Sequence, residues 1–309
     1  LLVGSDTREG LTKAELKELR VGSVATAAGK RSDTMLLVHI SKARDKAVLV
    51  SIPRDTFALI PAHLNKTGKT VPAVHSKINS AFNWGGAPLL IQTIEEMTQL
   101  KIDHYVEVNF AGFASVIDSL GGIEVCTKKD IDDPKSHLVL PAGVHTLNGI
   151  EALKYVRTRE FDGMGDLGRM QRQQAFMSSV LKKATSAGVL LNPITMTSFI
   201  NSSLAAVTTD EGLKNSDLIT LAKQMKSLAT SNVRTLTVPL SDLNYYSNGV
   251  TAAVLWDPVL APELWDRLRE DRAVVDEVTA SPSPSSTKAA KVEIVDKFKT
   301  RTADDNICR

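Results

Sequence analysis

Short apolar runs, almost unbroken by polar residues, recur along the first part of the chain and limit the folds open to it. Such runs are typical of β-strands covered on both faces, because a strand with one wet face alternates apolar and polar residues. Segments with a helical repeat of apolar residues lie between and after them. This alternation predicts an α/β fold in which helices flank a central mixed β-sheet. The strand-like runs occupy residues 1–5, 34–40, 47–52, 104–109 and 233–239.

The helical segments carry recognisable start signals. Apolar residues at three- and four-residue spacing follow Pro88 and Phe110, which predicts a helix after each. Asn148 and Glu151 have the spacing of a capping box, in which each residue accepts a hydrogen bond from the backbone of the other. A longer helix is expected over residues 166–186.

The composition changes near the end of the chain. Residues 280–287 read ASPSPSST, which is typical of an extended, unpacked linker. We therefore expect one domain over residues 1–278, with its motifs within 1–187, and a Ser/Pro-rich linker and polar tail over 279–309. The 43% of hydrophobic residues is enough for a sizeable core. Residues 292–295 alternate and could add an edge strand.

Charge and hydropathy argue against a nucleic-acid-binding protein and against a membrane-spanning segment within these residues. Lys+Arg 37 against Asp+Glu 35 gives a net charge of +2, which argues against a broad nucleic-acid-binding surface. No run approaches the roughly 18 apolar residues that cross a bilayer. However, the chain opens with LLVG, which reads as the middle of a strand and lacks an initiator methionine. We expect that a membrane anchor or export signal has been removed upstream.

The two cysteines allow two interpretations. Cys126 and Cys308 lie far apart and form no CxxC pair, which argues against a zinc site. In an exported protein, a disulfide between them would tie the tail to the domain. Alternatively, Cys126 is a buried small apolar residue and Cys308 is a free thiol at a frayed end.

Arginines gather in short polar strings at the ends of the expected elements. A guanidinium offers a planar fork of donors that matches phosphate oxygens, and a nearby aspartate can hold the divalent cation of phosphate chemistry. Asp6 and Asp33 follow or open two strands, so one sheet edge could bring them to a shared Mg²⁺; alternatively they cap turns. The arginines are Arg31, Arg54, Arg157, Arg159, Arg169 and Arg172.

The densest string lies around the start of the long helix. Arg157 and Arg159 precede a glycine-rich turn, and Arg169, Arg172 and Gln173 then fall on one face of the helix. The alternative is a solvated face with internal ion pairs. A multiply charged phosphate ligand explains better why arginine, rather than lysine, recurs here.

These strings together resemble the LytR–CpsA–Psr family of bacterial cell-wall enzymes. The likeness is strong over residues 1–187, and the tail and the cysteines suggest an actinobacterial member. The matching strings are residues 4–8 (GSDTR), 31–34 (RSDT), 52–55 (IPRD), 77–79 (KIN), 108–113 (VNFAGF), 120–125 (LGGIEV) and 157–173.

The resemblance implies a domain on the extracytoplasmic face of the cell membrane, anchored by an N-terminal transmembrane helix. It implies an Mg²⁺-dependent phosphotransferase, with Mn²⁺ as an alternative ion. This enzyme moves a glycopolymer phosphate, such as teichoic acid or arabinogalactan, from a polyprenyl-pyrophosphate carrier to a peptidoglycan hydroxyl. Two alternatives stay open: a non-catalytic, regulatory polyprenyl-phosphate-binding protein, and a polyprenyl pyrophosphatase.

The resemblance also implies roles for the matching residues. Asp6 and Asp33 would bind the metal, and the catalytic group would consist of Arg54, Arg159, Asp33 and Asp166, with the base left open between the two aspartates. Ala58 stands where some members have a further arginine. The pyrophosphate would be held by Arg31, Arg54, Lys77, Arg157, Arg159, Arg169 and Gln173.

A polyprenyl tail requires a long apolar cavity, which we expect between the sheet and the helices. Each candidate lining residue also fits an ordinary core position. The candidates are Phe82, Trp84, Val106, Val108, Phe110, Phe113 and Ile117.

Overall fold

A seven-stranded mixed sheet forms the centre of the protein and confirms the expected fold class. The computed structural model describes residues 1–21, 32–159, 165–186, 193–224, 228, 230–279 and 292–302. The strand order is β13-β8-β1-β2-β3-β14-β19. These strands are β1 (Leu2–Ser5), β2 (Ser32–Ile40), β3 (Ala47–Ile52), β8 (Val106–Val108), β13 (Thr208–Thr209), β14 (Val233–Thr237) and β19 (Arg301–Thr302).

The strand directions bring several strand ends to one edge of this sheet. β1 is parallel to β8, and β3 is parallel to β14, while β2 runs antiparallel to both β1 and β3. The carboxyl ends of β1, β3, β8 and β14 therefore lie at the same edge as the start of β2. We call it the carboxyl edge. Ligands of open α/β sheets bind at such an edge.

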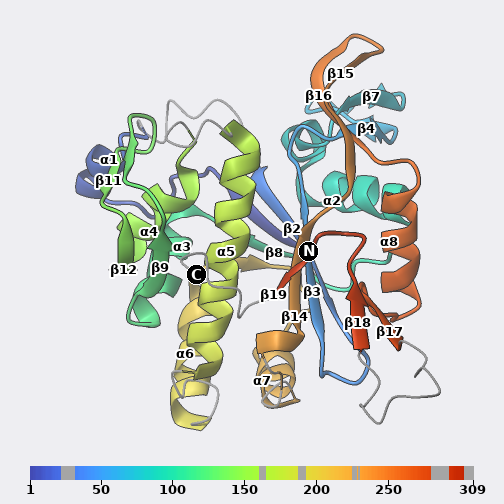
Figure 1. Ribbon diagram of the computed structural model, residues 1–309. Coiled ribbons are helices and arrows are strands. Elements are labelled where there is room, and N and C mark those ends of the chain that lie inside the picture. Colours follow the sequence, from blue (N-terminus) through green and yellow to red (C-terminus); the bar gives the residue numbers. More distant parts are fainter. Residues whose placement is uncertain are drawn as a thin grey trace, which may run out of the picture.

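Helices cover both faces of the sheet (Figure 1). The alternation of side chains along β3 divides its residues between them: Val48, Val50 and Ile52 join one core cluster, while Ala47 and Leu49 join another. On the first side lie α2 (Asn79–Thr98) and α8 (Leu260–Arg269). On the other lie α3 (Phe110–Ser119), α4 (Gly149–Arg157), α5 (Gly165–Ser186) and α6 (Pro193–Ala205).

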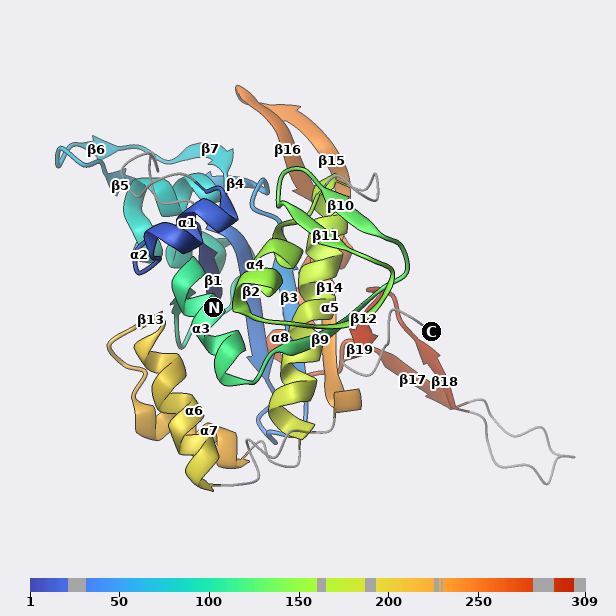
Figure 2. The ribbon, with the colours of Figure 1, turned by 90° about the vertical axis from the view of Figure 1, so that its left-hand side faces the viewer.

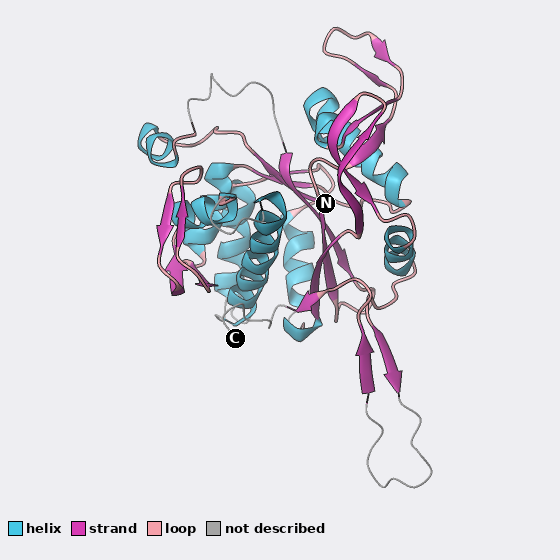
Figure 3. Cartoon of the chain, turned by 45° about the horizontal axis from the view of Figure 1, so that its top comes forward, coloured by secondary structure: helices cyan, strands magenta, loops and turns pink. Residues whose placement is uncertain are grey.

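Two-stranded hairpins surround the sheet, and Figures 2 and 3 show how far some of them project. Apart from the strand at residues 292–295, the sequence analysis did not predict them, because most of their strands are only two to five residues long. The pairs are β4 (Phe57–Ile60) with β7 (Val74–Lys77), β5 (His63–Leu64) with β6 (Thr70–Val71), β9 (Ile123–Thr127) with β12 (Gly143–Leu147), β10 (Ile131–Asp133) with β11 (Leu138–Leu140), β15 (Leu240–Ser247) with β16 (Val250–Trp256), and β17 (Asp276–Thr279) with β18 (Val292–Val295).

Local signals set the helix boundaries. The capping box of Asn148 and Glu151 is present, with both reciprocal hydrogen bonds, and α4 begins directly after Asn148. α2 begins at Asn79 rather than near Pro88, but Gly86 has a φ of 66° and breaks it. The proline thus opens the second half of a kinked helix. The remaining helices are α1 (Lys13–Leu19) and α7 (Asn215–Gln224).

The chain after 279 packs on the domain where the structure describes it. Phe298 is buried in the core cluster of α2 and α8. Residues 292–295 pair with β17 as β18, and the edge strand of the main sheet is β19, beside β14. Residues 280–291 lie outside the described residues. Within the described part, no helix is long and apolar enough to cross a membrane.

A buried amide of α5 forms hydrogen bonds to the middle of the sheet. The buried Gln174 donates from Nε2 to Ser51 Oγ of β3 at 3.0 Å and to Thr237 Oγ1 of β14 at 2.8 Å. Both acceptors belong to the carboxyl ends of their strands. These bonds, together with the packing of Met177 and Leu181 against the cluster of Ala47 and Leu49, set the position of α5 relative to the carboxyl edge.

We predict that Gln174→Leu lowers the free energy of unfolding by about 1–3 kcal/mol, because the buried hydroxyl of Ser51 loses its partner. Urea unfolding followed by circular dichroism measures this. The matched control is Gln92→Leu, which removes an exposed hydrogen bond to Glu96 within α2 and should cost no more than about 0.5 kcal/mol. Equal stabilities of the two variants would contradict the role of Gln174.

Candidate functional site

The first two motifs meet at the carboxyl edge as the sequence suggested. β1 and β2 are antiparallel, with Gly4 opposite Thr34 and Ser5 opposite Ser32. Asp6, which is half-buried, directly follows β1, and the backbone of Asp33 lies in β2 beside it. Carboxylate oxygens are the ligands that Mg²⁺ prefers, and one or two suffice. The backbone positions of the pair agree with a shared Mg²⁺ site, which stays a prediction. The side chain of Asp33 and the whole of Arg31 lie outside the described residues.

The third motif places Arg54 just beyond the end of β3. Its turn is held from α2, since Asn79 N donates to Arg54 O at 3.2 Å and Ile78 N donates to Thr56 O at 2.8 Å. The Asp55 carboxylate pairs with Arg54 Nε at 3.4 Å and with Lys77 Nζ at 3.3 Å. The ion pair between Arg54 and Asp55 therefore lies within the turn itself. The Asp55 carboxylate also brings the Lys77 ammonium group to this turn.

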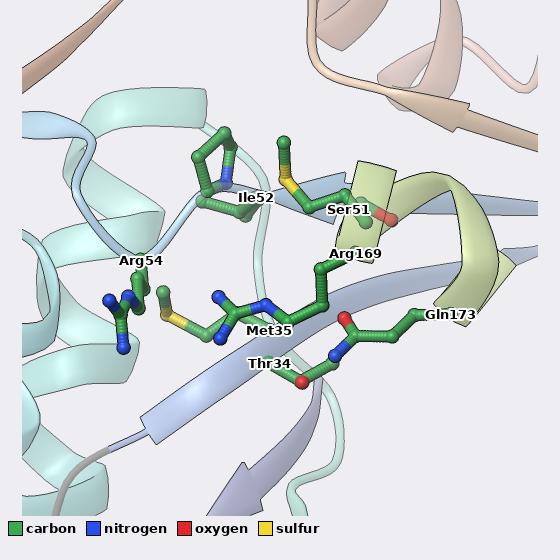
Figure 4. Close-up of a pocket in the computed structure, with 9 residues that line it drawn as sticks. Thr34, Met35, Ser51, Ile52, Arg54, Arg169 and Gln173 are labelled. Carbon is green, nitrogen blue, oxygen red and sulfur yellow. The ribbon is translucent and has the colours of Figure 1, made fainter. Parts of the chain in front are cut away.

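The long helix adds a buried arginine opposite this turn. Arg169 is only 3% exposed, and its guanidinium points toward Arg54 in Figure 4. Gln173, one turn further along α5, directs its amide toward the same space. A pocket opens between them at the carboxyl edge. It is lined by Thr34, Met35, Ser51, Ile52, Pro53, Arg54, Arg169, Met170 and Gln173.

Other polar groups of α5 hold the end of α4. Arg172 Nη2 donates to Thr158 O, and Gln173 Nε2 donates to Val156 O at 3.1 Å. A helix C-terminus carries partial negative charge, so a cation there is stabilising. Arg172 thus acts on the backbone beside the pocket. Burial raises the pKa of the Tyr155 phenol, although the nearby Arg172 charge acts in the opposite direction. The raised pKa keeps the phenol neutral.

Arg157 and Arg159 emerge from this held end of α4. The Arg157 guanidinium lies over the Phe110 ring, 5.2 Å from its centroid, in a cation–π contact. Arg159 N donates to Oδ2 of Asp133, a carboxylate that is 1% exposed. Its Oδ1 accepts from Lys135 N at 2.9 Å and Ser136 N at 2.8 Å. Sequence reasoning missed Asp133, whose signal was an aspartate on the buried side of the alternating strand β10.

The geometry brings together part of the predicted phosphate-binding set. Arg54, Arg169 and Gln173 line the pocket at the end of β3, and Lys77 pairs with Asp55 of the same turn. The backbone of residues 156–159 is held by α5 and Asp133. The side chain of Asp166, in the first turn of α5, lies outside the described residues. Among the described residues, no cluster of three His, Cys, Asp or Glu side chains could form a larger metal site.

The predicted lipid-contacting residues do not gather in one place. Phe82 and Trp84 of α2 pack in the core cluster on one side of the sheet, whereas Phe110, Phe113 and Ile117 of α3 pack in the cluster on the other. Val106 and Val108 lie in β8 between them and are half-buried. A single cavity lined by all seven residues would have to cross the sheet. The α2 residues and the α3 residues therefore belong to separate apolar cores.

The structure describes one of the two cysteines of the predicted disulfide. Cys126 lies in β9, opposite Val144 of β12. Cys308 lies outside the described residues, and their pairing stays a prediction.

Comparison with known proteins gives curated relatives that include cell-wall enzymes. The probable cell wall biosynthesis protein LcpB of Corynebacterium glutamicum is 36% identical over 269 residues, which are 87% of this chain and 60% of that protein. The polyisoprenyl-teichoic acid–peptidoglycan teichoic acid transferase TagT of Bacillus subtilis is 36% identical over 192 residues, or 60% of this chain and 52% of TagT. The chain thus spans about half to three fifths of the length of these two relatives.

A solved structure agrees with these matches. The structure of TagT bound to LI-WTA superposes with a TM-score of 0.64 and 29% identity, covering 88% of each chain. Residues 1–263 match the LytR_cpsA_psr family, so the match includes every motif string described above. The chain therefore belongs to the LytR_cpsA_psr family.

Proposed function

We propose that this protein is a phosphotransferase that moves a glycopolymer phosphate from a polyprenyl-pyrophosphate carrier to a hydroxyl of peptidoglycan. The observation that carries the proposal is the pocket at the carboxyl edge, where Arg54, Arg169 and Gln173 converge. Two guanidinium groups and an amide provide donors for several oxygens of one diphosphate. The name of the relative TagT, which includes a polyisoprenyl-linked donor and a peptidoglycan acceptor, supports the choice of substrates.

The reaction requires one substitution at phosphorus. The acceptor oxygen forms a bond to the phosphorus that carries the sugar, and the bond from that phosphorus to the bridging oxygen breaks. Polyprenyl phosphate leaves with the electron pair, and the acceptor's proton passes to a base, for which Asp33 and Asp166 are the candidates. Phosphoryl transfer of this kind depends mainly on positioning and on stabilising charge.

The chain's own residues divide these tasks. Arg54 and Arg169 stabilise the charge that develops on the leaving phosphate, and Gln173 orients an oxygen by hydrogen bonding. Lys77 offsets the negative charge of Asp55, which would otherwise weaken the positive potential around Arg54. Asp6 and Asp33 would hold a Mg²⁺ or Mn²⁺ ion, which neutralises charge on the diphosphate when bound. The protein would act at the extracytoplasmic face of the membrane, where polyprenyl carriers present their glycans.

We predict that Arg54→Ala lowers kcat/KM for a prenyl-pyrophosphate-linked glycan by about 10² or more, the usual effect of removing one donor to a developing anion. Release of prenyl phosphate in the presence of Mg²⁺ measures it. The matched control is Arg272→Ala, an exposed arginine that pairs with Glu270 beyond the far end of α8. This control should keep wild-type activity.

The products discriminate between the three functions. Transfer requires a covalent glycan–acceptor product, whereas a pyrophosphatase releases the same prenyl phosphate with water alone. A regulatory binder would retain the donor without turnover. Equal activity of Arg54→Ala and Arg272→Ala would contradict the proposed site whichever product forms.

Asp133 provides a second prediction, because its Oδ2 positions the backbone of Arg159. Asp133→Asn keeps the size of the side chain, but either orientation of the amide turns an N–H group toward a backbone donor. We predict that the KM for the donor rises about tenfold, a change of about 1.4 kcal/mol in binding. Steady-state kinetics at saturating acceptor measure it.

The control for this prediction is Asp132→Asn, since Asp132 is the exposed neighbour in the same strand. It should leave both KM and the melting temperature unchanged. If Asp133→Asn lowers the melting temperature but leaves the donor KM at the wild-type value, Asp133 stabilises the fold without positioning Arg159.

A further inference from the structure

Aromatic rings from two neighbouring hairpins meet next to the pocket. Phe57 of β4 stacks on His75 of β7, with centroids 5.0 Å apart and an interplanar angle of 11°. Tyr245 of β15 meets the Phe57 ring edge-on at 5.1 Å. In the pairing of β4 with β7, Leu59 lies opposite His75, so its side chain is on the same face. We call Phe57, Leu59, His75 and Tyr245 the aromatic face. Its three rings are half-buried and Leu59 is exposed.

The aromatic face continues directly from the turn that carries Arg54. Phe57 is three residues beyond Arg54, and Asp55 O accepts from Val254 N of β16 at 2.8 Å. Trp256 Nε1 donates to Thr56 Oγ1 at 3.2 Å, which fixes the same hairpin to the same turn. β4, β7, β15 and β16 lie together at one end of the molecule (Figure 1). A ligand on the aromatic face would therefore adjoin the pocket.

The hairpin beside these rings has an unusual composition for a protein surface. Residues 241–249 read SDLNYYSNG, and residues 240–256 contain neither lysine nor arginine. Leu243 is 50% exposed and Tyr246 is 60% exposed. Asn248 Nδ2 lies 3.4 Å from His75 Nδ1, so an amide borders the stacked rings. Tyrosine with serine, asparagine and glycine is the composition of surfaces that bind polar ligands through rigid rings and adaptable hydrogen bonds.

Sugars have the complementary chemistry. A pyranose ring presents an apolar face of C–H groups, which the negative face of an aromatic ring attracts, and a rim of hydroxyls, which amides and serine hydroxyls can bind. A membrane surface requires a different pattern, a broad apolar face flanked by lysine and arginine. The hairpin has exposed amides at its tip and no cation, which favours a glycan over a bilayer.

We propose that the aromatic face and the β15–β16 hairpin form a docking site for an uncharged glycan strand. It would hold the acceptor so that one of its sugar hydroxyls reaches the diphosphate in the pocket. The acceptor role rests on the proposed function, whereas glycan binding itself does not. In this arrangement, arginines bind the phosphates of the donor and aromatic rings bind the sugars of the acceptor.

The test uses the full chain and chitotetraose, an uncharged N-acetylglucosamine oligomer, with binding measured by calorimetry. We expect Tyr245→Ala/Tyr246→Ala to weaken the affinity by about tenfold or more. Because Tyr245 also packs on Phe57, a second variant, Leu243→Ala/Tyr246→Ala, truncates only side chains that are 50% and 60% exposed and should weaken binding as well. The control is Val139→Ala/Val259→Ala, which truncates side chains that are 74% and 70% exposed outside the hairpin. It should bind as the wild type does.

The outcomes separate this proposal from the function on which it builds. Glycan binding without donor turnover would support the docking site and contradict the proposed function. No binding of chitotetraose by the wild type, or equal affinities for all variants, would overturn the docking site. It would also be overturned if the wild type instead bound phosphatidylglycerol vesicles and the hairpin variants lost that binding.

Discussion

The docking of α5 on the sheet places Arg169 and Gln173 at the pocket, and the polar contact at the centre of this docking comes from Gln174. Its amide bridges Ser51 of β3 and Thr237 of β14, two parallel strands that end at the carboxyl edge. Because Gln173 is the next residue and Arg169 lies a little more than one turn away, the same bonds bring both side chains over the end of β3. The arginine that follows β3 then completes the pocket. A shift of α5 by one turn would remove it.

Arginines can be buried here because backbone carbonyls and an aromatic ring stabilise their charge. Guanidinium groups stay charged and are weakly hydrated, so they tolerate burial better than ammonium groups do. Arg172 and Gln173 bind carbonyls at the negative end of α4, and the Phe110 ring receives Arg157. These contacts offset part of the desolvation. They also order the donors before an anion arrives, which lowers the entropy lost on binding.

The sequence predicted the strands of the sheet well, since buried strands leave continuous apolar runs such as residues 47–52. It also predicted the meeting of Asp6 with the start of β2, because strand ends carry the motifs. It did not predict most of the two-stranded hairpins, because most of their strands are too short for a clear pattern. It also did not predict Asp133, whose role depends on a contact with Arg159 across 26 residues. The expected lipid-contacting residues divided between two core clusters, because apolar composition alone does not specify which face of a sheet a helix covers.

The most direct test is a crystal structure of the protein with geranyl pyrophosphate and Mg²⁺. The account predicts that the diphosphate lies at the carboxyl edge, with its oxygens within hydrogen-bonding distance of the guanidinium groups of Arg54 and Arg169. An ordered diphosphate bound elsewhere on the chain, with neither arginine in contact with it, would contradict the assignment of the pocket.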